Sequence, residues 1–263
     1  QTAASFVWPV NPPATAMFMG AGYLGTSVTL LGALAMARSW GQVSLLIGPV
    51  VVFAALMLSA TGLHAGRFFW DRPQTWLWVT LYGVILAGAG WLALSPPPDP
   101  PGAFRQARLT GLERLGLGTA GASMAVATGA LFLAPELASP AWPWPLTPLT
   151  ARVVAAWIAV GATLSLAAAL RGNSVSVRIP LIGWTITVLL FELAALIGLP
   201  ADVLNEPVAR LYLVVLGTSV LGSIWLPPRW DLAHLRLGVP NDPRDRPAVT
   251  RGKSPTSPRR THL

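Results

Sequence analysis

Residues 43–65, VSLLIGPVVVFAALMLSATGLHA, hold no aspartate, glutamate, lysine or arginine, and this stretch decides the fold. Roughly 20 apolar residues in a helix are enough to cross the hydrocarbon core of a bilayer. Outward from it, the same pattern recurs at 17–37, 76–94, 116–134, 153–170, 181–199 and 211–226. Because unpaired backbone groups are too costly in lipid, we predict an all-α integral membrane protein with seven transmembrane helices.

The composition of the chain excludes other classes. Of the 263 residues, 53% are hydrophobic and only 11% are charged, whereas a soluble domain carries about a quarter charged residues. Cysteine is absent, so disulfides, thiolate metal sites and cysteine nucleophiles are excluded. We find no H-E-x-x-H motif, no P-loop lysine and no Ser/His/Asp constellation, so the sequence names no catalytic residue and does not favour an enzyme.

The positive charge is concentrated at the C-terminal end. The net charge is +8, and the segment from Arg229 onward holds eight basic and three acidic residues. This distribution argues against a nucleic-acid-binding fold. With the N-terminus outside, the inner loops carry six arginines and the outer loops four, which predicts an N-out, C-in topology. The basic tail is then cytoplasmic and is expected to contact anionic lipid or a partner subunit.

A repeat relates the first three spans to the last three. Trp8-Pro9-x-x-Pro12 recurs as Trp144-Pro145-x-x-Pro148, and the offset of 136 falls to 135 and then 134 further along. The later matches are Leu46-Ile47-Gly48 with Leu181-Ile182-Gly183, and Pro73, Gly83 and Trp91 with Pro207, Gly217 and Trp225. The spare fourth span restores the direction of the chain, so we predict a parallel 3+1+3 internal repeat.

This repeat sets the predicted organisation of the chain. The connector is expected to lie against both halves through Gly121, Ala125 and Gly129, whose i, i+4, i+8 spacing lets helices approach closely. Tryptophans near the span ends, Trp8 and Trp144 among them, are interpreted as an interfacial belt. The predicted segments are an outer N-terminal segment 1–16, a first repeat with inner loop 17–114, a connector 115–139, a second repeat 140–232 and a cytoplasmic tail 233–263.

One carboxylate is the candidate substrate or proton site. Glu192 is the only charged residue well inside a predicted span, and an ionisable group there is a functional candidate by default. Its repeat partner is Met57, and with Tyr82 these residues predict a site between the two halves. The alternative is a protonated glutamic acid that is hydrogen-bonded to a neighbouring helix or subunit.

The number and positions of histidine and lysine limit which cofactors this chain can bind. His64, followed by Arg67, is the only histidine in the membrane region, so a bis-histidine haem cannot be built from this chain alone. A quinone or a singly ligated pigment at His64 and Arg67 stays open, as does simple pairing of His64 with Asp71. The only lysine, Lys253, lies in the tail, which excludes a retinal Schiff base. No cofactor or metal is required by the sequence.

Three resemblances add expectations. The 3+1+3 arrangement resembles SWEET and PQ-loop transporters, which use prolines within their spans as hinges; here Pro49 is interior and Pro180 is placed at a span start. Leu63-His64-Ala65-Gly66-Arg67 resembles a segment of the quinol-binding membrane anchors of DMSO and polysulfide reductases. Residues 12–23 and 63–78, with their His-x-x-Arg-Phe and Trp-x-Trp patterns, are similar to a family of uncharacterised bacterial polytopic proteins, which implies a bacterial inner membrane and no function.

The leading functional expectation is a non-catalytic integral membrane subunit, a scaffold or anchor, of a larger membrane assembly such as a respiratory or photosynthetic complex. Its partners would be the lipid bilayer and other membrane subunits. One alternative is a small-solute transporter whose site lies between the repeats. The other is a redox membrane anchor that binds a quinone or pigment.

Overall fold

The computed structural model describes residues 6–98, 108–171 and 174–225, and all the regular elements in these ranges are helices. This description leaves out the side chains of 174–175 and 223–225 and the predicted tail 233–263. The long helices are α2 (Pro13–Met36), α3 (Ile47–Leu63), α4 (Pro73–Leu94), α5 (Gly111–Leu133), α7 (Pro148–Arg171), α8 (Ser174–Gly198) and α10 (Pro207–Trp225). Short elements join them: η1 (Trp40–Gln42), η2 (Ser44–Leu46), η3 (Ala65–Arg67), α6 (Pro135–Ala138), η4 (Ser139–Ala141) and α9 (Ala201–Leu204).

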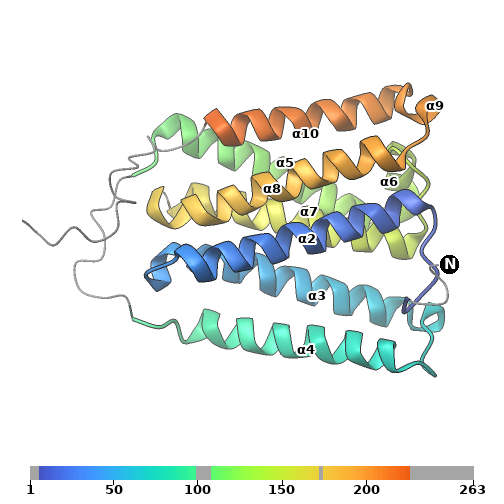
Figure 1. Cartoon of the computed structure of the whole chain (residues 1–263), viewed down its shortest axis with the longest axis horizontal. Helices are drawn as coiled ribbons and strands as arrows, with labels where there is room; N and C mark the ends of the chain where they lie inside the picture. Colours follow the sequence, from blue (N-terminus) through green and yellow to red (C-terminus); the bar gives the residue numbers. More distant parts are fainter. Residues whose placement is uncertain (1–5, 99–107, 172–173, 226–263) are drawn as a thin grey trace, which may run out of the picture. The chain divides into compact units, whose positions relative to one another are not determined.

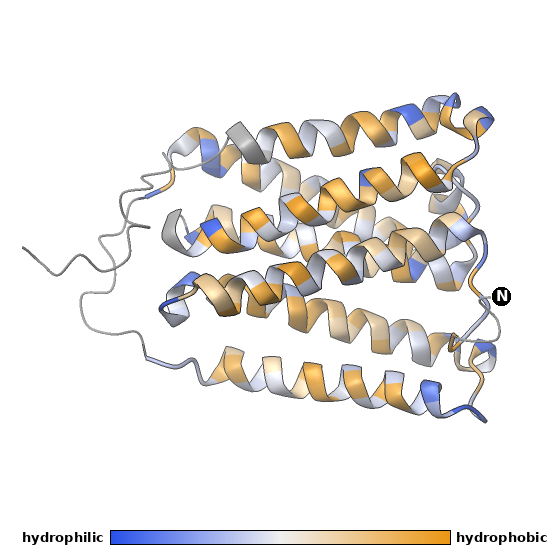
Figure 2. Cartoon of the chain, viewed as in Figure 1, coloured by the Kyte–Doolittle hydropathy of each residue, from blue (hydrophilic) through white to orange (hydrophobic). Residues whose placement is uncertain are grey.

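The protein is an α-helical chain with the helices of a membrane protein. Six helices in the described ranges are long and apolar enough to cross a bilayer, and they correspond to the first six predicted spans. The seventh predicted span is the shorter apolar helix α10. Figure 2 shows hydrophobic residues along the lengths of the helices and strongly hydrophilic ones mainly toward their ends.

Most of these helices begin earlier than the apolar stretches that predict them. Four of the seven long helices, α2, α4, α7 and α10, begin at Pro13, Pro73, Pro148 and Pro207. Proline suits the first helical position because its missing N–H has no partner there and its fixed φ fits the helix. Apolar stretches alone miss this first turn, so the predicted starts of these spans were several residues late.

The positions of the two prolines nearest the pocket described below are also corrected. The predicted start of the sixth span at 181 is too late, because α8 already begins at Ser174 and contains Pro180. Pro49, predicted to be interior, lies in the first turn of α3. A proline inside a helix removes one backbone hydrogen bond, whereas a proline in the first turn costs little. The interrupted helix is therefore α8.

Helix α7 is central to the packing of the described residues (Figure 1). It packs against α5 and α3, while α3 also packs against α4. Helix α2 packs against α8, and α8 also packs against α10. Small residues allow this close approach; seven of the residues buried along α7 are alanine or glycine: Ala151, Ala155, Ala156, Ala159, Gly161, Ala162 and Ala168.

Trp8 and Trp144 belong to the core, so their assignment to the interfacial belt was wrong. Trp8 is 1% exposed and Trp144 is 4% exposed. The Trp144 indole donates a hydrogen bond from Nε1 to Thr15 Oγ1 over 3.0 Å. Each indole precedes a helix start by only a few residues, and it packs against other helices: Trp8 against Trp78 of α4, and Trp144 against Phe18 of α2. Trp76 and Trp91, by contrast, are 58% and 69% exposed, as a belt requires.

The stripe of small residues on α5 is only partly a packing surface. A Cβ on Gly121 would come within 2.8 Å of Leu166 Cγ on α7, so no larger residue fits. Ala125 is exposed, and a Cβ on Gly129 would meet nothing within 4 Å. The face toward α7 instead continues through Met124, whose sulfur lies close to Gly161. The α5–α7 contact is the most extensive of this helix.

Candidate functional site

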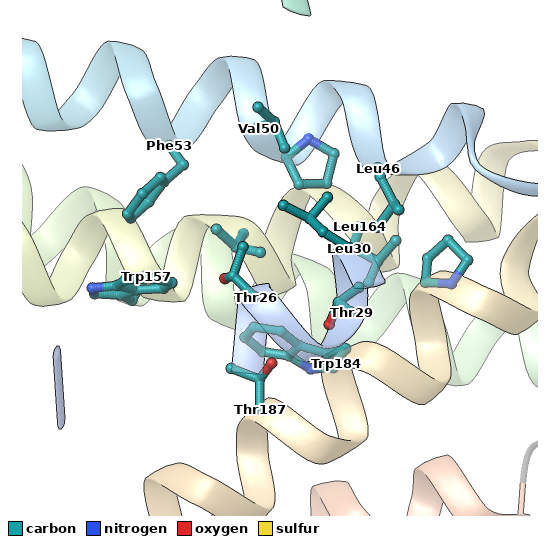
Figure 3. Close-up of a pocket in the computed structure, with 13 residues that line it drawn as sticks. Thr26, Thr29, Leu30, Leu46, Val50, Phe53, Trp157, Leu164, Trp184 and Thr187 are labelled. Carbon is teal, nitrogen blue, oxygen red and sulfur yellow. The ribbon is translucent and has the colours of Figure 1, made fainter. Parts of the chain in front are cut away.

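A cavity of about 70 Å³ lies where α2, α3, α7 and α8 meet. It is partly open and mostly apolar, and Figure 3 shows its lining. Each of the four helices contributes side chains: Thr26, Thr29 and Leu30 from α2; Pro49, Val50 and Phe53 from α3; Trp157, Val160 and Leu164 from α7; and Pro180, Trp184 and Thr187 from α8, with Leu46 preceding α3. The volume suits a solute of a few heavy atoms or a small number of waters.

The polar groups of this pocket are few. Thr29 Oγ1 donates to Gly25 O over 2.7 Å, and Thr187 Oγ1 donates to Gly183 O over 2.9 Å. Their protons are therefore used within their own helices. No hydrogen bond to the Thr26 hydroxyl or the Trp184 indole is found among the described residues. A bound solute can thus use one hydroxyl and one N–H, together with the lone pairs of the two bonded threonines.

Glycines bring the walls of the pocket together. The backbone of Gly183 lies directly against the Thr29 side chain, and Gly161 lies directly against the Trp184 ring. Neither position has room for a Cβ. The ring of Trp157 closes another side of the pocket, and its nitrogen lies at the end of the ring away from Thr26 and Trp184 (Figure 3). This nitrogen is buried and has no hydrogen-bond partner in the described part of the chain.

Of the predicted site residues, Tyr82 packs against the wall of this pocket, and Met57 is connected to Tyr82 through neighbouring side chains. The Tyr82 and Tyr23 hydroxyls are 2.7 Å apart, and the Tyr82 ring packs edge-on against Phe53, which lines the cavity. The Met57 carbonyl accepts a hydrogen bond from Thr61, and that hydroxyl accepts one from the Trp78 indole. Since Trp78 also packs against Tyr82, one network joins Met57 to Tyr82.

Glu192 lies elsewhere. It is half-buried on α8, and its Oε1 is 3.6 Å from a Cβ built on Gly217 of α10. It also lies close enough to Tyr212 for an electrostatic interaction. The Tyr212 hydroxyl is buried and has no hydrogen-bond partner among the residues described. Glu192 therefore faces the α8–α10 contact, and it is not among the residues that line the central pocket.

The predicted cofactor residues separate as well. His64, at the C-terminal end of α3, lies 2.6 Å from Arg152 Nη1 through its Nε2 atom. Burial, followed by the positive charges of Arg152 and Arg67, lowers the pKa of His64. Arg67 is exposed and does not line the open cleft that His64 and Arg152 share. Asp71, the pairing considered from the sequence, is not the partner that His64 has here.

The sequence alone did not reveal the partner Arg152 or the pocket threonines. Arg152 lies 88 positions from His64, and nothing in local spacing joins them. Thr26 and Thr187 follow no recognisable motif, although the repeat does bring their helices into consideration. No family model, curated protein or solved structure matches this chain. The three resemblances noted from the sequence therefore stay predictions.

Proposed function

We propose that this chain is a multi-pass membrane protein in which two parallel three-helix repeats, α2–α4 and α7–α10, are joined by α5 and hold a small solute between them. The packing pairs support this symmetry. The α2–α8 contact corresponds to the α7–α3 contact, and the α3–α4 contact corresponds to the α8–α10 contact. A parallel repeat predicts such an exchange of partners. In this proposal α10 is the seventh span.

A glycine–threonine contact occurs in both halves. Gly183 lies against Thr29, and the corresponding Gly48 has the Thr163 methyl group 3.5 Å from its Cβ position. Thr29 and Thr163 each donate a hydrogen bond to the carbonyl four residues earlier, at Gly25 and Ala159, over 2.7 Å. Both halves therefore use one glycine–threonine contact where helices from different repeats cross. At the offset of 135 that relates Gly48 to Gly183, Thr163 is one position out of register with Thr29, so the two contacts are similar and not strictly equivalent.

The single observation that carries the solute proposal is the position of the cavity. It is lined by two helices from each proposed repeat, which is where transporters built from repeats bind their substrates. Pro180 interrupts α8 at its wall, and an interrupted helix can bend there during alternating access. The lining favours a small neutral solute with an apolar body and one or two hydrogen-bonding groups.

Uptake into proteoliposomes tests this function. The panel consists of radiolabelled glycerol, urea, short-chain amides and neutral amino acids. We expect one class to enter faster than into protein-free liposomes, and Val160→Trp, which fills the pocket, to abolish the difference. Val126→Trp is the matched control because Val126 is 73% exposed on α5. Val160→Leu replaces the larger substitution if Val160→Trp does not fold.

Two results would overturn the solute proposal. The first is that no member of the panel enters faster than into protein-free liposomes and that mass spectrometry finds no small molecule retained by the purified protein. The second is that the pocket-filling variant and the Val126 control transport equally well.

A second candidate function is the non-catalytic membrane subunit, and α4 favours it. This helix packs mainly against α3 and leaves much of its apolar surface exposed, including Leu77 at 68% and Val84 at 65%. A helix from another subunit could cover this face. Native mass spectrometry of mildly solubilised membranes should then find the chain bound to further membrane proteins, whereas a lone monomer would contradict this role.

A further inference from the structure

An open cleft of about 460 Å³ lies between the end of α3, the α5–α6 junction and the start of α7. Its polar lining consists of His64, Glu136 and Arg152. His64 caps α3, and Arg152 stands in the second turn of α7. Both are thus at the ends of apolar helices, and a helix that crosses a bilayer reaches the lipid headgroups at its ends. The central pocket is lined by other residues and is independent of this cleft.

Arg152 is held in place and still has donors to offer. Its Nε donates to the Phe132 carbonyl over 3.0 Å, and its Nη1 lies 2.6 Å from His64 Nε2. A guanidinium carries more N–H donors than these two contacts use. Within the described ranges, no carboxylate forms an ion pair with Arg152. The cleft does contain one carboxylate, Glu136, but it is exposed and is not paired with Arg152.

His64 supplies a second donor. Because arginine has no acceptor, the Nε2 atom of His64 must accept the hydrogen bond from Arg152, and the ring proton of the neutral imidazole then lies on Nδ1. The lowered pKa of His64, caused first by burial and then by Arg152 and Arg67, keeps the ring neutral at physiological pH. The cleft is therefore lined by the guanidinium of Arg152 and by a neutral imidazole whose ring N–H is not used by Arg152.

We propose that this cleft binds an oxyanion, either the phosphate of an anionic phospholipid headgroup or free inorganic phosphate, with Arg152 as its cationic ligand and His64 as a further donor. Arginine suits phosphate because its planar fork presents several N–H groups to the oxygens. The exposed carboxylate of Glu136 also lines the cleft and weakens the binding by repulsion. Leu133 and Leu137 beside it match the first carbons of a lipid chain.

Two assays separate the sources of the oxyanion. Native mass spectrometry measures retention of phosphatidylglycerol against phosphatidylcholine, and thermal unfolding measures stabilisation by inorganic phosphate. Arg152→Gln should weaken binding at least about tenfold, because a charge-assisted hydrogen bond is lost. Glu136→Gln should strengthen binding. Arg210→Gln is the matched control, since Arg210 is an exposed arginine outside the cleft and is not among the charges that act on His64, and it should leave binding unchanged.

The outcomes decide both the site and its ligand. A preference for phosphatidylglycerol without a response to phosphate identifies a lipid headgroup site, and a response to phosphate identifies a site for the free ion. Binding in neither assay, or an equal loss in Arg210→Gln and Arg152→Gln, overturns the proposal. If Arg152→Gln does not fold, Glu136→Gln decides alone, because unchanged or weaker binding in that variant contradicts an oxyanion in this cleft.

Discussion

The Trp144 indole joins the two halves of the sequence through one buried hydrogen bond, from Nε1 to Thr15 Oγ1 over 3.0 Å. Trp144→Phe removes the donor while it keeps an aromatic ring in the core. A buried hydrogen bond contributes about 1 kcal/mol to stability, so we expect the variant to unfold at a lower temperature in detergent. The measurement is the midpoint of thermal unfolding, monitored by circular dichroism.

Trp91→Phe is the control for Trp144→Phe. Trp91 is 69% exposed at the end of α4, and no hydrogen bond of its indole is found within the described residues. The same substitution there should leave the midpoint unchanged. Equal midpoints for the wild type, Trp144→Phe and Trp91→Phe would show that the Trp144–Thr15 bond adds nothing to stability.

His64 should make stability depend on pH. Burial and the charges of Arg152 and Arg67 lower its pKa in the folded protein below the usual 6.5. The unfolded chain therefore takes up the proton first as the pH falls, and the folded state loses stability below pH 6.5 until the pKa of the folded state is reached. We expect the unfolding midpoint to fall between about pH 7.5 and 5.5 by less in His64→Gln than in the wild type.

Arg67→Gln should give an intermediate dependence of stability on pH. It removes one of the two positive charges that lower the His64 pKa, so its loss of stability toward acid should lie between those of the wild type and His64→Gln. An identical acid dependence in the wild type and His64→Gln would contradict a neutral His64 in the folded protein.

At the scale of an element, α5 offers a test within one helix. Gly121→Leu places atoms where Leu166 already lies, 2.8 Å from the Cβ position, whereas a Cβ at Gly129 would meet nothing within 4 Å. Overpacking costs about 1–3 kcal/mol. We therefore expect Gly121→Leu to lower the unfolding midpoint strongly and Gly129→Leu to leave it nearly unchanged. Equal effects would mean that α5 does not pack against α7 through Gly121.

The same helix shows how far sequence reasoning reaches at this scale. Hydropathy predicted every long helix in order, because roughly 20 consecutive apolar residues have few other uses. It could not tell the lipid-facing side from the packed side, since both are apolar in a membrane protein. The i, i+4, i+8 stripe on α5 is therefore correct at Gly121 and misleading at Gly129. Pro180 shows the same limit, because a few polar residues before it concealed the first turns of α8.

For the whole molecule, contacts between distant segments were the part the sequence could not supply. The repeat led to the expectation of a site between the halves, and a cavity does lie between α2, α3, α7 and α8. The residues expected there, however, were chosen for their unusual chemistry. Glu192 proved to face α10, while Thr26 and Trp184 were ordinary residues on the right helices. Side-chain direction around a helix decides such questions, and hydropathy does not encode it.

Cysteine labelling tests the parallel repeat and the orientation together. The chain has no cysteine, so single substitutions report without background. Pro9 and Pro145 are exposed and occupy equivalent positions in the two Trp-Pro-x-x-Pro segments. In intact cells, a maleimide that cannot cross the membrane should label Pro9→Cys and Pro145→Cys equally from outside, because parallel repeats place both segments on the same face.

Ser95→Cys provides the opposite face in this experiment. Ser95 is exposed directly after α4, one span away from the Pro73 end, so it should react only after the cells are permeabilised. If Pro9→Cys and Pro145→Cys reacted only after permeabilisation and Ser95→Cys reacted without it, the N-out orientation would be reversed while the parallel repeat survived. If Pro9→Cys and Pro145→Cys instead reacted from opposite sides, the chain would have to cross the membrane an odd number of times between them, whereas the proposed spans α2 to α5 give an even number. The repeat, α5 as its connector and the pocket between the halves would then all have to be abandoned, because each depends on α2 and α7 crossing the membrane in the same direction.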